Sequence, residues 1–185
     1  GGTYFSGMVN PERFVLMSPY YQATLMLLFK IVGFSYRLAR DVSWCYMALA
    51  YAGILMLVRR RPFPLLSAGV ASLFFLGATA VVAGNMVRPE AMVWAMVVWS
   101  FVLGDRGHLW KALALSGVAV LVHQIALVFF GGILLLFLLE VWRKRGCIRP
   151  TRSDWIVMAG AAVLLGVHVY WMIQFWGTTM ADSQA

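Results

Sequence analysis

Charged side chains are scarce in this sequence, because only 12% of its residues are Asp, Glu, Lys or Arg while 62% are hydrophobic. Soluble domains carry about 25% charged residues, so the composition excludes an ordinary soluble protein. Acidic residues are scarcer than basic ones, with 7 Asp and Glu against 15 Lys and Arg. The basic residues lie in short segments between apolar runs, which is typical of membrane orientation signals. We therefore expect a polytopic membrane protein that contacts membrane lipid and binds no nucleic acid.

Cysteines and recognisable catalytic motifs are also scarce. Cys45 lies in an apolar run and Cys147 in a basic loop, and their spacing fits neither a disulfide framework nor a metal site. The sequence contains no phosphate-binding glycine loop, nucleophile elbow, dinucleotide fingerprint or cluster of metal ligands. The motifs therefore identify no metal site and no cofactor, and no single motif proves a reaction.

The two ends of the sequence resemble the middle of a longer polypeptide. The chain opens with Gly1-Gly2-Thr3 instead of Met, shows no signal peptide, and stops at Ala185 soon after a hydrophobic segment. We therefore expect a fragment of a longer protein.

Hydrophobic segments of helical length recur along the whole chain and predict an all-α fold. We expect one transmembrane domain over residues 1–185, a polytopic bundle of about five full or short spans plus one interfacial helix. The segment at residues 14–32 contains Ser18-Pro19 and Lys30, which fits a helix lying in the outer interface. Membrane helices are expected at residues 38–58, 65–84, 90–103, 109–122, 125–140 and 155–176.

The apolar stretch at residues 109–140 is too long for one span. As a single helix it would extend roughly 45 Å, whereas the hydrocarbon core of a membrane is about 30 Å thick. Two short helices that turn back near His123 solve this problem. The turn also places the three clearly basic loops, residues 59–61, 106–111 and 143–152, on the inner side, as the positive-inside rule requires.

With this orientation, two polar motifs lie on the outer face together with residues 177–182. Arg88-Pro89-Glu90 either forms a capped helix start or binds an anionic headgroup, with two parallel hydrogen bonds from Arg88 and with Glu90 orienting it or acting as an acid or base. His123-Gln124 either satisfies backbone groups freed by the helix break or offers a hydrogen-bond donor or proton acceptor to a phosphate. The residue types leave both alternatives open for each motif.

Three stretches of the sequence carry a family resemblance. Pro19-Tyr20-Tyr21, followed by Gly33-Phe34-Ser35 and Arg37-Leu38-Ala39, looks like a P-x-Y helix, a glycine–serine turn and the start of the next span. Val87-Arg88-Pro89-Glu90-Ala91 is similar to a short Arg-Pro-acidic loop before a hydrophobic helix, and the helix pair around His123 carries a His near its turn. In these features the chain resembles the GT-C superfamily of integral-membrane glycosyltransferases, which includes the protein O-mannosyltransferases and the lipid A aminoarabinose transferases.

The resemblance implies transfer of a sugar from a polyprenyl-phosphate donor to an acceptor on the outer face of the membrane. The implied location is a bacterial inner or plasma membrane with an extracytoplasmic active face. Arg88, His123 and Gln124 would contact the donor phosphate, and Glu90 would organise them. The family's catalytic acidic residue follows a first span that this chain lacks, so it is expected upstream of Gly1 and the fragment is expected to be inactive alone. Many members use a divalent cation, which is therefore an implied cofactor, although the sequence shows no carboxylate cluster for one.

Two other functions fit the same features. A transporter, flippase or polymerase of lipid-linked glycans would also place Arg and His on the outer face, and a non-catalytic membrane subunit would use neither. Transporters more often contain repeated halves with helices broken near the midplane, and no repeat is evident here. An acidic outer loop directly upstream of Gly1 would favour the enzyme, whereas an earlier half resembling this one would favour transport.

Overall fold

The computed structural model describes residues 19–75, 77, 87, 89–144 and 148–182, and this part of the chain contains α-helices and no β-strand. The all-α class expected from the sequence is therefore confirmed. The helices are α2 (Pro19–Val32), α3 (Tyr36–Val58), α4 (Pro64–Phe75), α6 (Glu90–Asp105), α7 (Leu109–Val122), α8 (Ala126–Arg143) and α9 (Arg152–Asp182).

Among the described residues, three helical segments are long and apolar enough to cross a membrane, judged by length and composition. These are Tyr36–Val58, Ala126–Arg143 and Arg152–Gln174, and the apolar window of the last has no buried residue within the chain. The helices α2, α4 and α7 contain shorter apolar segments. Together these features indicate a multi-pass membrane protein.

Several helix bounds differ from the expected ranges. The helix expected at 65–84 is observed as α4 only to Phe75, and residues 78–86 lie outside the described part of the chain. The helix expected at 14–32 is observed from Pro19, and residues 14–18 are likewise outside it. The helix α7 has the expected bounds, α3 begins two residues earlier at Tyr36, and α8 begins one residue later at Ala126. The helices α6, α8 and α9 continue beyond their expected ranges into charged residues.

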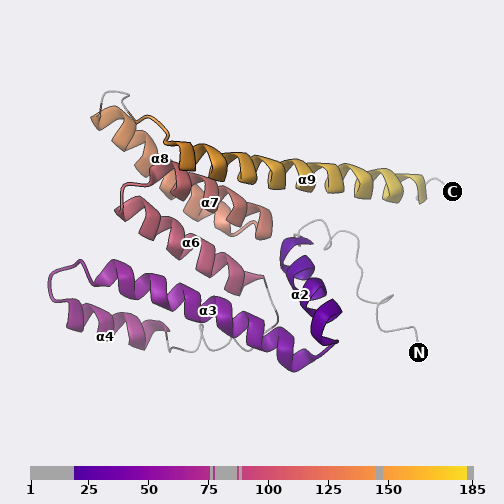
Figure 1. Cartoon of the computed structure of the whole chain (residues 1–185), viewed down its shortest axis with the longest axis horizontal. Coiled ribbons are helices and arrows are strands. Elements are labelled where there is room, and N and C mark those ends of the chain that lie inside the picture. Colours follow the sequence, from indigo (N-terminus) through magenta and orange to yellow (C-terminus); the bar gives the residue numbers. More distant parts are fainter. Residues whose placement is uncertain (1–18, 76, 78–86, 88, 145–147, 183–185) are drawn as a thin grey trace.

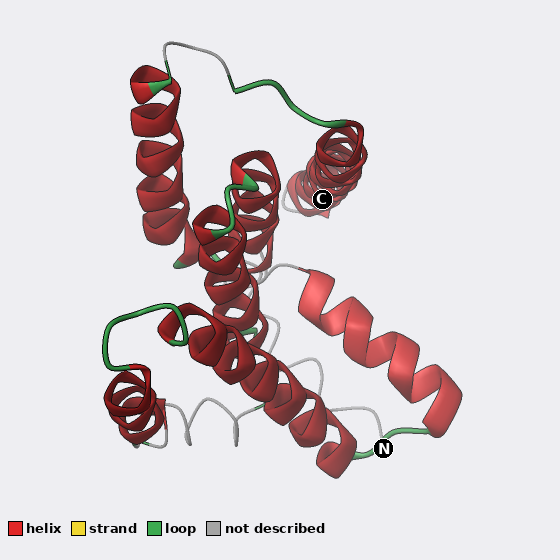
Figure 2. Ribbon diagram, turned by 60° about the vertical axis from the view of Figure 1, so that its left-hand side comes forward, coloured by secondary structure: helices red, strands yellow, loops and turns green. Residues whose placement is uncertain are grey.

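The helix α6 lies at the centre of the bundle, between α3 and α7 (Figure 1). The helices α8 and α9 pack against α7, and α2 contacts it more lightly. The helix α4 packs against α3. Figure 2 shows the same arrangement from the side, with α4 and α9 on opposite flanks of the bundle. The main core cluster draws small and β-branched residues from these helices, among them Ala39, Val97, Ala119 and Val122. Small side chains let α3, α6 and α7 approach closely, as is common in membrane helix bundles.

Successive helices run back and forth, so the connections gather at two ends of the bundle (Figure 1). At the left-hand end of that view lie the α3–α4, α6–α7 and α8–α9 connections. We call this the basic end, because most of the Lys and Arg residues that the structure describes lie in or near these connections, namely Arg59, Arg60, Arg61, Arg106, Lys111, Arg143, Lys144, Arg149 and Arg152. At the right-hand end lie α2, the start of α6 and the α7–α8 turn. We call it the Glu90 end.

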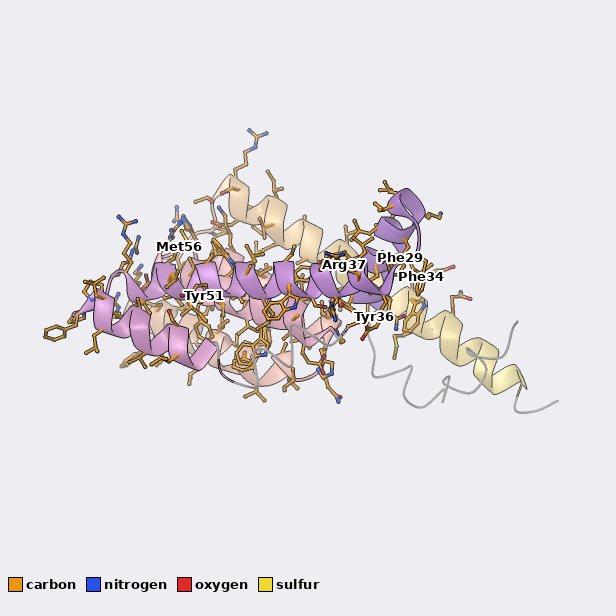
Figure 3. All side chains as sticks on the ribbon, turned by 90° about the horizontal axis from the view of Figure 1, so that it is seen from below. Phe29, Phe34, Tyr36, Arg37, Tyr51 and Met56 are labelled. Carbon is orange, nitrogen blue, oxygen red and sulfur yellow. The ribbon has the colours of Figure 1, made fainter. Side chains whose placement is uncertain are left out.

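The turn between α2 and α3 shows why its residues are Gly and Ser. Gly33 has a φ of +92°, a left-handed conformation that ends α2, and its N–H donates to the carbonyl of Phe29 at 3.0 Å. Ser35 then caps α3 by accepting a hydrogen bond from the N–H of Leu38 at 3.4 Å. Figure 3 shows the aromatic rings of Phe29 and Phe34 at this junction, with centroids 5.0 Å apart. Helix capping thus accounts for this part of the family-like motif.

Candidate functional site

Glu90 lies in the first turn of α6, directly beside the α7–α8 turn. A small cavity of about 70 Å³ is lined by Glu90, Trp94 and other residues of α6 on one side, and by Ile125 and Phe129 on the other. The rings of Trp94 and Phe129 lie 5.9 Å apart across this contact. One carboxylate oxygen of Glu90 is buried. Glu90 therefore lies beside Ile125 of the turn that follows His123, and the N-terminal helix dipole of α6 favours its negative charge.

The helix α2 reaches the same end through Tyr21. The Tyr21 hydroxyl is hydrogen-bonded to the Ser43 hydroxyl of α3 at 2.7 Å, and both side chains are buried. The rings of Tyr21 and Tyr46 lie 6.5 Å apart. Burial raises the pKa of the Tyr21 hydroxyl above its usual value, and the nearby charge of Glu90 raises it further. Tyr21 therefore stays neutral and connects α2 to α3 close to Glu90.

Tyr20, its neighbour, ties α2 to α9 on the other side. Its hydroxyl donates to the carbonyl of Leu164, and its ring stacks on His168 with centroids 5.9 Å apart. The Pro19-Tyr20-Tyr21 motif thus docks α2 between two long helices. This docking gives the motif a structural role that does not depend on any ligand.

His123 ends α7 in an extended conformation, with φ −160° and ψ 136°. Its Nδ1 accepts a hydrogen bond from the backbone N–H of Ile125 at 3.2 Å, and its carbonyl accepts from the N–H of Ala126 at 3.0 Å. The side chain therefore satisfies a backbone donor freed by the helix break, which is one of the two roles expected for it. With Nδ1 accepting, the neutral ring carries its proton on Nε2 and can donate it outward.

The structure places the remaining candidates as follows. Gln124 is exposed at the tip of the α7–α8 turn, and its backbone carbonyl accepts from the N–H of Leu127 at 3.0 Å. Pro89 precedes α6, and its carbonyl accepts from the N–H of Val93 at 3.0 Å. Arg88 lies outside the described residues, so its expected role at this site stays a prediction.

A divalent cation finds no ligand set in the described part of the chain. No group of three or more His, Cys, Asp or Glu side chains there could hold a metal ion. The carboxylates at the two ends are separated by the length of the bundle (Figure 1), since Glu90 begins α6 and Asp105 ends it.

Sequence reasoning missed the pair formed by Tyr21 and Ser43. Aromatic rings near a helix end favour the membrane interface, so the sequence alone indicates no buried partner for Tyr21. The available signal was weak: Tyr21 and Leu25 lie four residues apart on one face of α2, and both are buried. Only the packing of α2 against α3 shows that Ser43 is the partner.

Comparison of this chain with protein-family models, with curated proteins and with solved structures gives no match.

Proposed function

We propose that this chain belongs to a GT-C-type glycosyltransferase that moves a sugar from a polyprenyl-phosphate donor to an acceptor on the outer face of a membrane. One observation supports the proposal most directly. Glu90 and the His123–Gln124 turn meet at one end of the bundle, remote from the basic end, and α2 docks beside them. Glu90, Tyr21 and the turn after His123, which belong to three family-like stretches, support the proposal because they lie at one end of the bundle.

The proposed donor site uses these residues in different roles. Arg88 would hold the lipid phosphate through two parallel hydrogen bonds, and Glu90 would orient Arg88. The Nε2–H of His123 and the amide of Gln124 would donate to the remaining phosphate oxygens. These donors would stabilise the negative charge that develops on the phosphate as the lipid leaves.

The reaction proposed for this site is a direct displacement. The acceptor hydroxyl oxygen forms a bond to the anomeric carbon of the sugar while the bond from that carbon to the phosphate oxygen breaks. A carboxylate takes the hydroxyl proton, and the polyprenyl phosphate leaves with the electron pair. This step would take place on the extracytoplasmic side of a bacterial inner or plasma membrane.

Arg88 provides the test. In membranes that contain the full-length protein, undecaprenyl-phosphate-linked mannose and aminoarabinose serve as donors, and sugar transfer is measured. Arg88→Ala is expected to lower turnover at least a hundredfold, and Arg88→Lys to restore little of it, because a lysine lacks the two-pronged geometry. The control Arg37→Ala removes an exposed cation from the start of α3 at the same end and is expected to leave turnover unchanged.

Three results would overturn the proposal. Wild-type turnover in Arg88→Ala at equal expression would remove Arg88 from the donor site. Translocation of the intact lipid-linked sugar across proteoliposomes, with no transfer to any acceptor, would instead identify a transporter, flippase or polymerase. If the full-length protein shows no transfer and no translocation, it is a non-catalytic membrane subunit.

A second variant separates the two roles of His123. Asn at this position can still accept the hydrogen bond from the N–H of Ile125, as Asn side chains do two residues before a backbone donor. It cannot place a donor where Nε2 lies. His123→Asn is therefore expected to keep the thermal stability of the protein and to lower transfer about tenfold or more, whereas equal transfer would limit His123 to the helix turn.

A further inference from the structure

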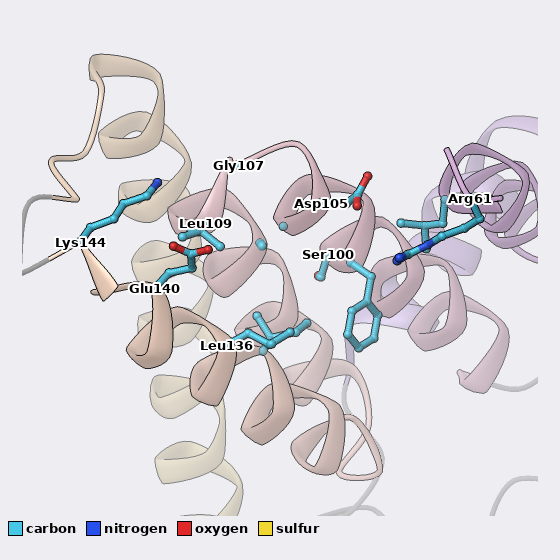
Figure 4. A pocket seen from close by; sticks show the side chains of 13 residues that line it. Arg61, Ser100, Asp105, Gly107, Leu109, Leu136, Glu140 and Lys144 are labelled. Carbon is cyan, nitrogen blue, oxygen red and sulfur yellow. The ribbon is translucent and has the colours of Figure 1, made fainter. Parts of the chain in front are cut away.

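A second, larger cavity lies at the basic end, among α3, α6, α7 and α8. Its volume is about 360 Å³, within the range of pockets that hold small molecules. The apolar part of its wall comes from Leu57, Phe101, Ile133 and Leu136. Figure 4 shows Arg61 and Lys144 on opposite sides of the cavity, with Asp105 and Glu140 between them. The cavity therefore joins an apolar wall to a charged rim.

The charges on the rim do not cancel. Asp105 is paired with Arg60 at 3.2 Å, and Glu140 with Arg143 at 2.8 Å. Neither Arg60 nor Arg143 lines the cavity, so both acids are neutralised from outside it.

Arg61 and Lys144, in contrast, form no ion pair with any residue that the structure describes, and both are exposed. They are the uncompensated charges of the lining. The cavity is thus electropositive at its rim.

At the floor of the cavity, away from the charged rim, the hydroxyl of Ser100 is not a free hydrogen-bond donor. The hydroxyl of Ser100 is buried and donates to the carbonyl of Met96 at 2.8 Å. Gly104 and Ala112 add only backbone and a methyl group to the same wall. A ligand that fits this cavity would therefore be apolar where it meets the floor and anionic where it meets the rim.

We propose that this cavity binds an anionic phospholipid of the inner leaflet, with its phosphate near Arg61 or Lys144 and its glycerol and upper acyl chain against Leu136 and Ile133. The helices around the cavity include two long enough to cross a membrane, so the rim lies where headgroups lie. The inner leaflet is the one that carries anionic lipid and attracts basic segments. A soluble anion would gain nothing from the apolar wall. This inference rests on the membrane location and the basic end, and it does not depend on the proposed sugar transfer.

Native mass spectrometry of the full-length protein in detergent tests the site with dioleoyl phosphatidylglycerol and dioleoyl phosphatidylcholine as probes. The wild type is expected to bind the first phosphatidylglycerol about tenfold more tightly than phosphatidylcholine. The double variant Arg61→Gln/Lys144→Gln is expected to lose this preference. The matched control Arg59→Gln/Arg149→Gln removes two exposed cations of the same end that do not line the cavity, and it is expected to keep the preference.

The apolar wall has its own matched pair on α8. Leu136 lines the cavity and Leu135 does not, and the two are 51% and 58% exposed. Leu136→Trp fills part of the cavity and is expected to weaken phosphatidylglycerol binding about tenfold, whereas Leu135→Trp is expected to leave it unchanged. Inorganic phosphate at millimolar concentration is expected not to displace the lipid.

Three results would overturn the proposal. Equal loss of preference in both double variants would reduce the effect to general attraction of basic loops. Equal binding by the two tryptophan variants would place the lipid elsewhere. Displacement of the lipid by inorganic phosphate would assign the cavity to a soluble anion.

Discussion

The two ends of the helix bundle are built from different residues, although the same helices connect them. The basic end contains exposed ion pairs, such as Arg60 with Asp105 and Arg143 with Glu140, around an open cavity. The Glu90 end contains a buried hydroxyl pair, Tyr21 with Ser43, and a cavity of only about 70 Å³. Exposed ion pairs contribute little to stability, whereas buried hydrogen bonds position helices relative to one another. The difference suggests that charge sets orientation at the basic end, while packing sets geometry at the Glu90 end.

The largest effect is expected where α3 and α6 cross, because these helices join the two ends. A Cβ atom on Gly53 would lie 2.6 Å from Cγ1 of Val98, and valine is too stiff to move aside easily. Gly53→Leu is therefore expected to destabilise the fold by about 3 kcal/mol, measured as a loss of thermal stability in detergent. Gly69→Leu on α4 is the control, since nothing lies within 4 Å of a Cβ there. Equal losses in the two variants would contradict the close crossing.

A smaller effect is expected at the basic end, where Asp154 lies in the first turn of α9. Its carboxylate accepts from the N–H of Thr151 at 2.7 Å and from the Thr151 hydroxyl at 2.6 Å, and the Asp154 N–H returns a bond to that hydroxyl oxygen. This reciprocal cap is a capping box. Asp154→Ala is expected to lower the free energy of unfolding by about 1–2 kcal/mol and to speed amide hydrogen exchange in the first turn of α9. Asp41→Ala removes an exposed carboxylate from α3 and should leave that exchange unchanged, and faster exchange in both variants would argue against the cap.

The smallest effect is expected at the Glu90 end. Tyr21→Phe removes one hydrogen bond, while Ser43 keeps its bond to the carbonyl of Ala39 at 3.4 Å. The free energy of unfolding, measured by thermal unfolding, is expected to fall by about 1 kcal/mol. Tyr36→Phe, at a residue that is 62% exposed, is expected to change nothing measurable. If the two variants behave alike, the hydroxyl pair does not hold α2 in place.

The helix break near His123 could be predicted from the sequence, because length alone forbids one helix through residues 109–140. The structure ends α7 at Val122 and begins α8 at Ala126. The gathering of the basic loops at one end also follows from an alternating chain with a turn at that position. Both predictions rest on constraints that act along the chain and need no knowledge of side-chain packing.

Other features could not be predicted from hydropathy. The helix α8 ends only at Arg143, and α9 already begins at Arg152, although the sequence is polar at both places. A helix needs satisfied backbone groups and tolerates charged side chains, and here the Glu140–Arg143 pair and the Thr151–Asp154 cap support the extra turns. The contact between Tyr21 and Ser43 depends on how α2 docks on α3, which no local pattern specifies.

The proposed sugar transfer and the proposed lipid site both require the two ends of the bundle to lie on opposite sides of the membrane. Single cysteines at Gln124→Cys and Arg59→Cys, both exposed positions, test this after the native Cys45 and Cys147 are replaced by serine. In intact cells a membrane-impermeant maleimide is expected to label position 124, and to label position 59 only after the membrane is permeabilised. Labelling of both positions in intact cells, or of position 59 alone, would contradict the account.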